Sequence, residues 1–131
     1  MTDRARILVL DDEVLVGIEI SDYIEELGHE VSGPFTSDKA AAQAIARDNP
    51  DLALLDVNLG DGKTSEPVAK ALRDADIPII YVTATNPREI EYRNENDRVV
   101  GKPFSRTALI GAIRQALSRL EAEERRSMDN L

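Results

Sequence analysis

Polar side chains that can bind a cation or a phosphoryl group follow four short apolar runs, each at the point where the run ends. They are Asp11 and Asp12 after residues 7–10, Asp56 and Asn58 after residues 52–55, Thr83 after residues 79–82, and Lys102 after residues 99–100. If these runs are neighbouring parallel strands, three carboxylates, a hydroxyl and an amine meet at one edge of a sheet. Asp56 is the candidate reactive group, because it is the single carboxylate that ends its apolar run.

The three aspartates favour a divalent cation. Carboxylates that share a small volume repel one another, and a bound cation removes that conflict. The ligands at hand are all oxygen atoms, since the chain has no cysteine and its one histidine, His29, lies in a predicted surface turn away from the cluster. We therefore expect Mg²⁺ or Mn²⁺ rather than zinc, held by two carboxylates, a backbone carbonyl near Asn58 and several waters.

An aspartate beside Mg²⁺, with an amine and a hydroxyl opposite, is equipped for phosphoryl transfer. Aspartate carboxylates act as nucleophiles that form aspartyl phosphates. The cation and Lys102 would neutralise the equatorial oxygens of the phosphoryl group, which is most of what this reaction asks of a protein. Thr83 would donate a hydrogen bond to a phosphoryl oxygen and so move the end of its strand.

The elements that must position these groups alternate along the chain. Apolar runs predict strands at residues 6–10, 30–35, 52–56, 79–82 and 98–100, and helical periodicity predicts helices between and after them. Gly28 is well placed to end the first helix, and Ser105 can cap the last, whose apolar positions run to Leu120. Residues 86–97 predict only a short, mobile or absent helix. The pattern indicates a doubly wound α/β sandwich of three layers with a parallel sheet.

Size and composition limit the possible functions. The 131 residues suffice for one domain, which we place at residues 1–121, with residues 122–131 as a fraying, solvated tail and no effector domain. A formal net charge of −9 argues against a nucleic-acid surface. No apolar run approaches the length of a membrane span and no leader precedes the first strand, so we expect a cytoplasmic protein without a membrane anchor.

These motifs resemble those of the receiver domains of two-component response regulators. Five sites stand at the family's spacing over about residues 5 to 120: Asp11, Asp12, Asp56, Thr83 and the Lys102-Pro-Phe motif. The resemblance implies a flavodoxin-like, CheY-like fold with strand order 2-1-3-4-5. It implies that Asp56 accepts the phosphoryl group, that Asp11 and Asp12 hold Mg²⁺ with Asp12 the more direct ligand, and that Asn58 adds its backbone carbonyl. Thr83 becomes the switch residue, and Lys102 pairs with the phosphoryl group.

The same resemblance implies partners. The donor would be a phosphohistidine on a sensor histidine kinase or a histidine phosphotransfer protein, and the output would pass to a downstream protein. Residues 28–34, 67–72 and 77–84 are similar to a branch of stand-alone receivers, best known from alphaproteobacteria, in which the fourth helix is reduced. The chain departs from the family pattern where Val99 replaces an aromatic residue and where Gly60 replaces a frequent proline, which should loosen the loop after Asp56. It departs from the signature of the stand-alone branch where Ala84, in place of a glycine, follows the strand that bears Thr83.

Other interpretations fit parts of the pattern. Each residue alone has a structural explanation: Asp11, Asp12 and Glu13 precede a helix, where acids favour the dipole, and Asp56 precedes a turn. A dehalogenase-type phosphatase needs a second aspartate at position 58, and an FMN-binding flavodoxin needs a phosphate loop where Asp11 and Asp12 stand. A degenerate receiver, which binds partners without phosphorylation, stays open because of Val99. In none of the receiver interpretations is the chain an enzyme beyond its own phosphorylation and dephosphorylation.

Overall fold

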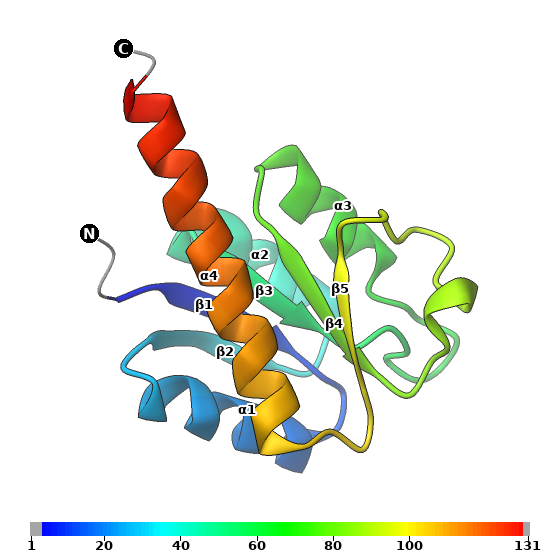
Figure 1. The fold of residues 1–131 in the computed structure, drawn as a ribbon. Helices are drawn as coiled ribbons and strands as arrows, with labels where there is room; N and C mark the ends of the chain where they lie inside the picture. The colour runs from blue at the N-terminus through cyan, green and yellow to red at the C-terminus, as the bar shows by residue number, and fades with distance from the viewer. Residues whose placement is uncertain (1–3, 130–131) are drawn as a thin grey trace.

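The computed structural model describes residues 4–129 and consists of a five-stranded sheet with helices on both faces (Figure 1). Strands and helices alternate along the chain in this order: β1 (Arg6–Leu10), α1 (Val14–Glu26), β2 (Glu30–Phe35), α2 (Asp38–Asp48), β3 (Leu52–Leu55), α3 (Glu66–Asp74), β4 (Ile79–Thr83), the 3-10 turn η1 (Pro87–Glu89), β5 (Arg98–Gly101) and α4 (Arg106–Asp129). The expected elements are therefore all present.

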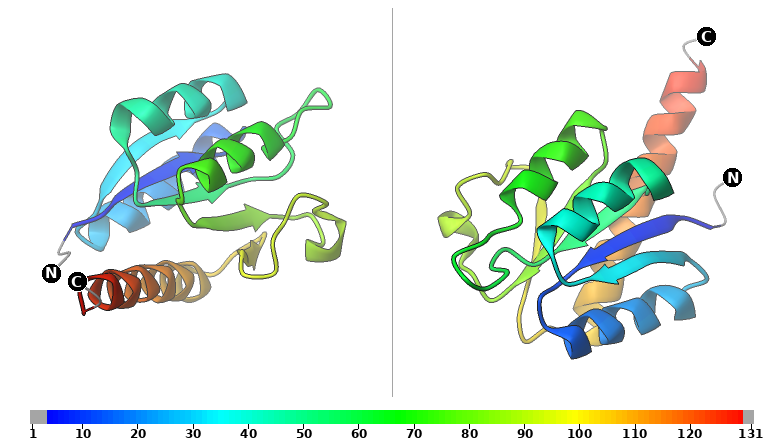
Figure 2. Two further views of the ribbon diagram at one scale, coloured as in Figure 1. Left: turned by 90° about the horizontal axis from the view of Figure 1, so that it is seen from above. Right: turned by 180° about the vertical axis from the view of Figure 1, so that it is seen from behind.

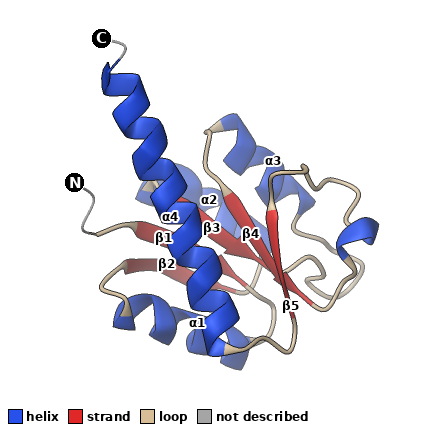
Figure 3. Ribbon diagram, viewed as in Figure 1, coloured by secondary structure: helices blue, strands red, loops and turns tan. Residues whose placement is uncertain are grey.

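The sheet has the strand order β2-β1-β3-β4-β5, and every pair of neighbours is parallel. This order confirms the predicted doubly wound α/β fold. The order reverses direction at β1, so the loops after β1 and β3 lie side by side where the sheet ends (Figure 3). A crevice at this position is the usual ligand site of such a fold.

Alternate residues of each central strand feed two separate cores, because side chains of a strand point to opposite faces. One core joins the sheet to α2 and α3, and the other joins it to α1 and α4, as the two faces seen in Figure 2 show. The strands β1, β3 and β4 are buried along almost their whole length. Their apolar runs were the strongest signal in the sequence, and these runs hold the site residues at fixed strand ends.

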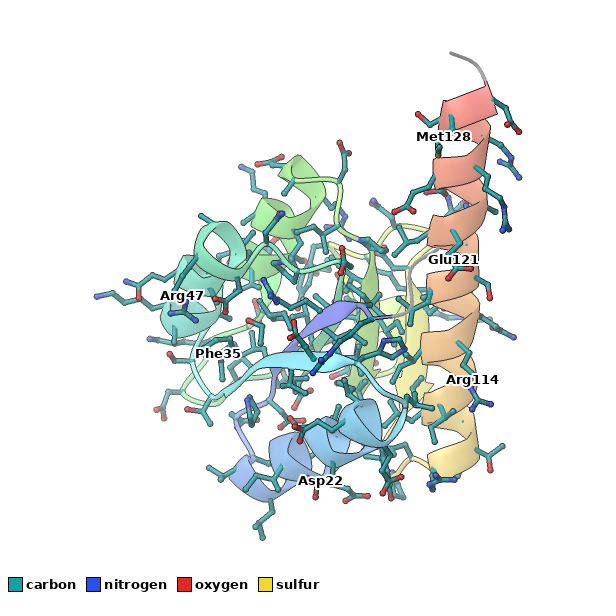
Figure 4. The ribbon with its side chains drawn as sticks, turned by 90° about the vertical axis from the view of Figure 1, so that its left-hand side faces the viewer. Asp22, Phe35, Arg47, Arg114, Glu121 and Met128 are labelled. Atoms are coloured by element: carbon teal, nitrogen blue, oxygen red, sulfur yellow. The ribbon has the colours of Figure 1, made fainter. Side chains whose placement is uncertain are left out.

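The last helix extends through most of the expected tail. Its buried residues end at Ala116, yet the helix continues to Asp129 and projects past the sheet, where Glu121 and Met128 lie on its far turns (Figure 4). Residues 122–129 of the expected tail are thus helical, while residues 130–131, like residues 1–3 of the expected domain, lie outside the described part. The charged residues beyond Leu120 carry no apolar periodicity, but glutamate, alanine and arginine are good helix formers, and this explains the extension.

The segment between β4 and β5 confirms the expectation of a reduced helix. It contains a single 3-10 turn, Pro87–Glu89, capped by the side chain of Asn86, which accepts a hydrogen bond from the Arg88 N–H at 3.0 Å. Only Ile90 is buried there, with Tyr92 partly buried beside the same core. Two apolar anchors are too few for an amphipathic helix.

Candidate phosphoacceptor and metal site

The loops after β1, β3, β4 and β5 bring the predicted residues to one end of the sheet. Asp11 follows β1 directly, and its N–H donates to the Phe35 carbonyl at 3.0 Å. Asp56 follows β3, and its N–H donates to the Leu10 carbonyl at 2.9 Å. Both carboxylates therefore extend from backbone that is fixed by the sheet. Asp11 is 1% exposed and Asp56 is 6% exposed, which is rare for aspartates without charged partners.

Lys102 supplies that charged partner. Its ammonium donates to Asp11 Oδ2 at 2.7 Å and to Asp56 Oδ2 at 3.1 Å, and lies 3.4 Å from Glu13 Oε1. Burial alone would lower the pKa of this lysine, but its hydrogen bonds to Asp11 and Asp56 outweigh burial and raise the pKa to about 12. Lys102 therefore stays charged throughout the physiological range. It bridges the two buried carboxylates.

Four carboxylates gather around this amine. One oxygen from each of Asp11, Asp12, Glu13 and Asp56 lies within 4.8 Å of the others. Burial raises the pKa of Asp11, and the hydrogen bond from Lys102 opposes that rise. A single lysine does not balance four acids, so the cluster carries an excess of negative charge. An all-oxygen set of this kind suits a hard divalent cation.

The cluster opens into a small cavity of about 300 Å³. Among its lining residues are Asp12, Asp56, Asn58, Thr83 and Lys102, so the predicted acceptor, metal, switch and amine positions face one space. Thr83 is 1% exposed, and its hydroxyl accepts a hydrogen bond from the Thr85 N–H at 3.2 Å. The cavity brings together every predicted site residue except Asp11, which accepts a hydrogen bond from the Lys102 ammonium.

The loop after Asp56 contains a left-handed turn and a hydrogen bond to the loop after β4. Gly60 has φ +81°, a left-handed conformation that favours glycine, and a Cβ there would lie 3.5 Å from Asp12 Oδ2. The Asn58 amide donates to the Thr85 hydroxyl at 3.2 Å, which links the loop after β3 to the loop after β4. Glycine at position 60 thus serves a left-handed turn beside Asp12.

Several contacts were not foreseen from the sequence. Asp97 pairs with Arg73 on α3, and the same guanidinium donates to the Tyr81 hydroxyl at 3.3 Å. Burial raises the pKa of Tyr81 to about 12. The Tyr92 and Ser65 hydroxyls lie 3.0 Å apart. The segment after β4 is thereby attached to both ends of α3, through pairs that are too far apart in the chain for periodicity to reveal.

Glu13 and His29 have contacts that were not predicted. Glu13 was considered only as one of three acids before a helix, and its carboxylate joins the acid cluster. The signal was available, because Glu13 follows Asp11 and Asp12 directly. His29 was expected at the surface, but it is partly buried and its Nδ1 accepts a hydrogen bond from the Ala5 N–H at 3.0 Å.

Comparison with known proteins agrees with this geometry. Residues 7–114 match the family described as the response regulator receiver domain. The chain belongs to the response regulator receiver family. Membership of this family places the chain in two-component signalling. It also accounts for the strand order and for the acid cluster at the carboxyl ends of the strands. No helix among the described residues is long and apolar enough to cross a membrane.

Curated relatives are similar over most of this chain. The phyllosphere-induced regulator PhyR of Methylorubrum extorquens is 32% identical over 95% of the chain and 48% of its own length. The transcriptional regulatory protein PdtaR of Mycobacterium tuberculosis is 30% identical over 87% of the chain and 57% of its own length. The receiver thus spans about half the length of these relatives.

Solved structures that resemble this receiver also include PhyR proteins. PhyR from Brucella abortus superposes with a TM-score of 0.86 at 29% identity, over 98% of this chain and 54% of that one. The receiver domain of PhyR from Erythrobacter litoralis gives a TM-score of 0.78 at 32% identity, over 87% of this chain and 90% of that one. These similarities confirm the resemblance to receivers of the alphaproteobacterial type.

Proposed function

We propose that this receiver is a phosphorylation switch in which Asp56 accepts a phosphoryl group from a phosphohistidine. One observation carries the proposal: Lys102 donates to both Asp11 and Asp56 at the wall of a cavity that Thr83 also lines. An acceptor, a cation binder and a hydroxyl donor are what transfer to aspartate requires. A structural ion pair would need neither the cavity nor the excess of acids.

Groups of the receiver itself orient the Asp56 carboxylate for the reaction. Asp56 Oδ1 accepts the Val57 N–H at 2.7 Å and Oδ2 accepts from Lys102, so both oxygens have a fixed direction. In the reaction, a carboxylate oxygen forms a bond to phosphorus as the bond from phosphorus to the donor's imidazole nitrogen breaks, and the freed imidazole leaves with the donor. Lys102 then neutralises a phosphoryl oxygen, and the Thr83 hydroxyl donates to another.

The acid cluster fits Mg²⁺. Asp11, Asp12 and Asp56, together with the backbone carbonyl of Asn58, would hold the ion, and Asp12 would be the more direct ligand. When bound, Mg²⁺ supplies the positive charge that lets an anionic phosphoryl group approach an acidic site. Lys102 alone cannot offset the charge of four carboxylates.

The donor is a protein, a sensor histidine kinase or a histidine phosphotransfer protein, and the output is a second protein in the cytoplasm. The start of α1 supports this, because it leaves large apolar side chains in solvent next to the acid cluster. Val14 is 58% exposed, Leu15 80% and Ile18 44%. Exposed apolar groups beside a reaction site are typical of a docking surface.

Intact-mass measurement tests the proposal. Incubation with Mg²⁺ and acetyl phosphate should add about 80 Da, the mass of one phosphoryl group, to the wild type. The Asp56→Asn variant should gain nothing. The matched control Asp61→Asn makes the same change on the neighbouring exposed loop and should be phosphorylated normally. If neither acetyl phosphate nor a phosphorylated kinase modifies the wild type, the degenerate receiver becomes the better interpretation.

A further inference from the structure

A second cavity, of about 430 Å³, lies at the amino ends of the strands, at the opposite end of the sheet from Asp56. Ala5, Asp51 and Ile77 line it, and each precedes a strand. Residues 114–124 of α4 form one wall. Small-molecule sites in proteins have volumes of this order. The cavity shares no lining residue with the cavity beside Asp56 and plays no part in the proposed reaction.

Apolar side chains form part of the wall of this cavity. Ala5, Pro50 and Ile77 are buried on the side of the sheet. Leu117 and Leu120 line the side of α4 and are only partly buried, although their spacing on the helix is that of core positions. An apolar ligand that fills the cavity would remove the exposed part of both leucines from water, which is favourable.

Acidic groups dominate the charged lining. The charged lining residues, His29 aside, are four acids and one arginine: Asp51, Asp76, Glu121, Glu124 and Arg114. Arg114 and Glu121 lie two turns apart on the wall formed by α4 (Figure 4). Within residues 4–129, none of the four acids forms an ion pair. Unpaired carboxylates around a partly apolar space attract a positively charged ligand.

Three helices also end at this cavity. The residues that follow the ends of α1, α2 and α3 line it, and they include His29, Asn49 and Ala75. The carboxyl end of a helix carries a partial negative charge, which favours a cation nearby. The last turn of α1 has no basic residue, and Arg47 and Arg73, in the last turns of α2 and α3, are each engaged in an ion pair. The helix ends therefore add to the attraction for a cation.

A second copy of the chain fits this cavity less well than a small molecule does. Its basic doublet, Arg125 and Arg126, is exposed near the end of α4. Glu121, Glu123 and Glu124 precede the doublet within about one turn of the same helix. A copy that inserted its doublet would bring these acids against the acids of the cavity, and like charges repel.

We propose that this cavity binds a small organic cation, in which an apolar body carries one ammonium group. The body would pack against Leu117, Leu120 and Ile77, and the ammonium would pair with the glutamates of the α4 wall. Binding does not require phosphorylation of Asp56, so this proposal holds or fails independently of the proposed switch.

Three ligands with the same indole body test whether the charge is recognised. Tryptamine carries an ammonium on the side chain of its ring, tryptophol a hydroxyl and indole-3-propionate a carboxylate. In a titration followed by the amide spectrum of the labelled protein, tryptophol should bind at least about fivefold more weakly than tryptamine, which is the factor that an exposed ion pair can supply. Indole-3-propionate should bind more weakly still. The amides that shift should be those of Ala5, His29 and Leu117, and those of Asp12 and Asn58 should not shift.

Variants of α4 supply the matched control. Glu121→Gln and Glu124→Gln each remove one charge from the cavity wall and should each weaken tryptamine binding about fivefold. Glu123→Gln makes the same change on the same turns, at a residue that does not line the cavity, and should bind tryptamine as the wild type does. Ser118→Phe should fill the cavity from α4 and block the binding of tryptamine.

Four results would overturn the proposal. Tryptophol would bind as tightly as tryptamine, Glu123→Gln would weaken binding as much as Glu121→Gln, or no amide at the cavity would shift with millimolar tryptamine. Shifts confined to Asp12 and Asp56 would instead assign the ammonium to the acid cluster. The cavity would belong to a second copy of the chain if its amides shifted with protein concentration alone, and this result too would contradict the proposal.

Discussion

The Lys102 ammonium lies 2.7 Å from Asp11 Oδ2, although the two residues are 91 positions apart in the chain. Lys102 follows the edge strand β5 and Asp11 follows β1, with β3 and β4 between them. The lysine side chain thus reaches over the ends of two strands. Side-chain exposure is 12% for the lysine and 1% for the aspartate, so the contact is largely shielded from solvent. Charge balance in this site therefore depends on one amine.

Loss of that amine should destabilise the metal-free protein. Lys102→Ala leaves Asp11 and Asp56 buried without a positive partner, which should lower the free energy of unfolding by about 3 kcal/mol, measured by urea denaturation. The double variant Lys102→Ala with Asp56→Asn should recover part of the loss, because one repelling carboxylate is gone. Equal stability of wild type and Lys102→Ala would contradict the assigned charge balance.

Magnesium should stabilise the folded chain. At a concentration ten times its dissociation constant, Mg²⁺ should add about 1.4 kcal/mol to the free energy of unfolding, seen as a rise in melting temperature. Asp12→Asn should lose most of this effect. Asp22→Asn, an exposed aspartate on α1, is the control and should respond as the wild type does. If both variants respond equally, the ion binds elsewhere.

His29 should make stability depend on pH near neutrality. Burial lowers its pKa below 6.5, and its Nδ1 accepts a hydrogen bond only while neutral. A base with a depressed pKa contributes stability above its unfolded pKa, and this contribution is lost as pH falls from about 6.5 through the folded pKa. His29 is the one histidine, so its ring protons can be followed directly by NMR. His29→Asn keeps an acceptor that does not titrate in this range, and it should show a flatter stability profile between pH 7 and 5.

Removal of the distal turns of α4 should cost little. The buried residues of this helix end at Ala116, so a chain that ends at residue 121 keeps the whole core. We expect less than about 1 kcal/mol of change in the free energy of unfolding, since exposed helix ends contribute weakly. A larger loss would mean that the removed residues 122–129 pack on the domain, and it would move the predicted boundary toward Asp129.

The sequence predicted the fold well where burial is continuous. Residues 7–10, 52–55 and 79–82 are apolar on both faces, which is typical of central parallel strands, and the polar residues after them mark the carboxyl ends. From this pattern alone, Asp56, Thr83 and Lys102 are expected to lie together. Because strand ends in a parallel sheet share one edge, the identity of the strands was enough to assemble the site.

Contacts between loops could not be predicted in the same way. Tyr92 and Ser65 meet through the path of an irregular segment, and Arg73 pairs with Asp97 across a sequence distance of 24 residues. Neither pairing produces a periodic pattern in the sequence. The length of α4 beyond Leu120 could not be predicted for a related reason, because apolar periodicity reports packing and does not reveal a helix that continues in solvent.

The attachment of the β4–β5 segment to α3 also offers an experimental handle. Between the anchors Tyr92 and Asp97 the chain makes a short exposed turn that includes Glu95. The protein has no cysteine, so Glu95→Cys would introduce a single thiol for a fluorophore or spin label. Such a probe lies outside the reaction cavity. It would report in real time whether phosphorylation of Asp56 breaks the contacts of Tyr92 and Asp97 with Ser65 and Arg73.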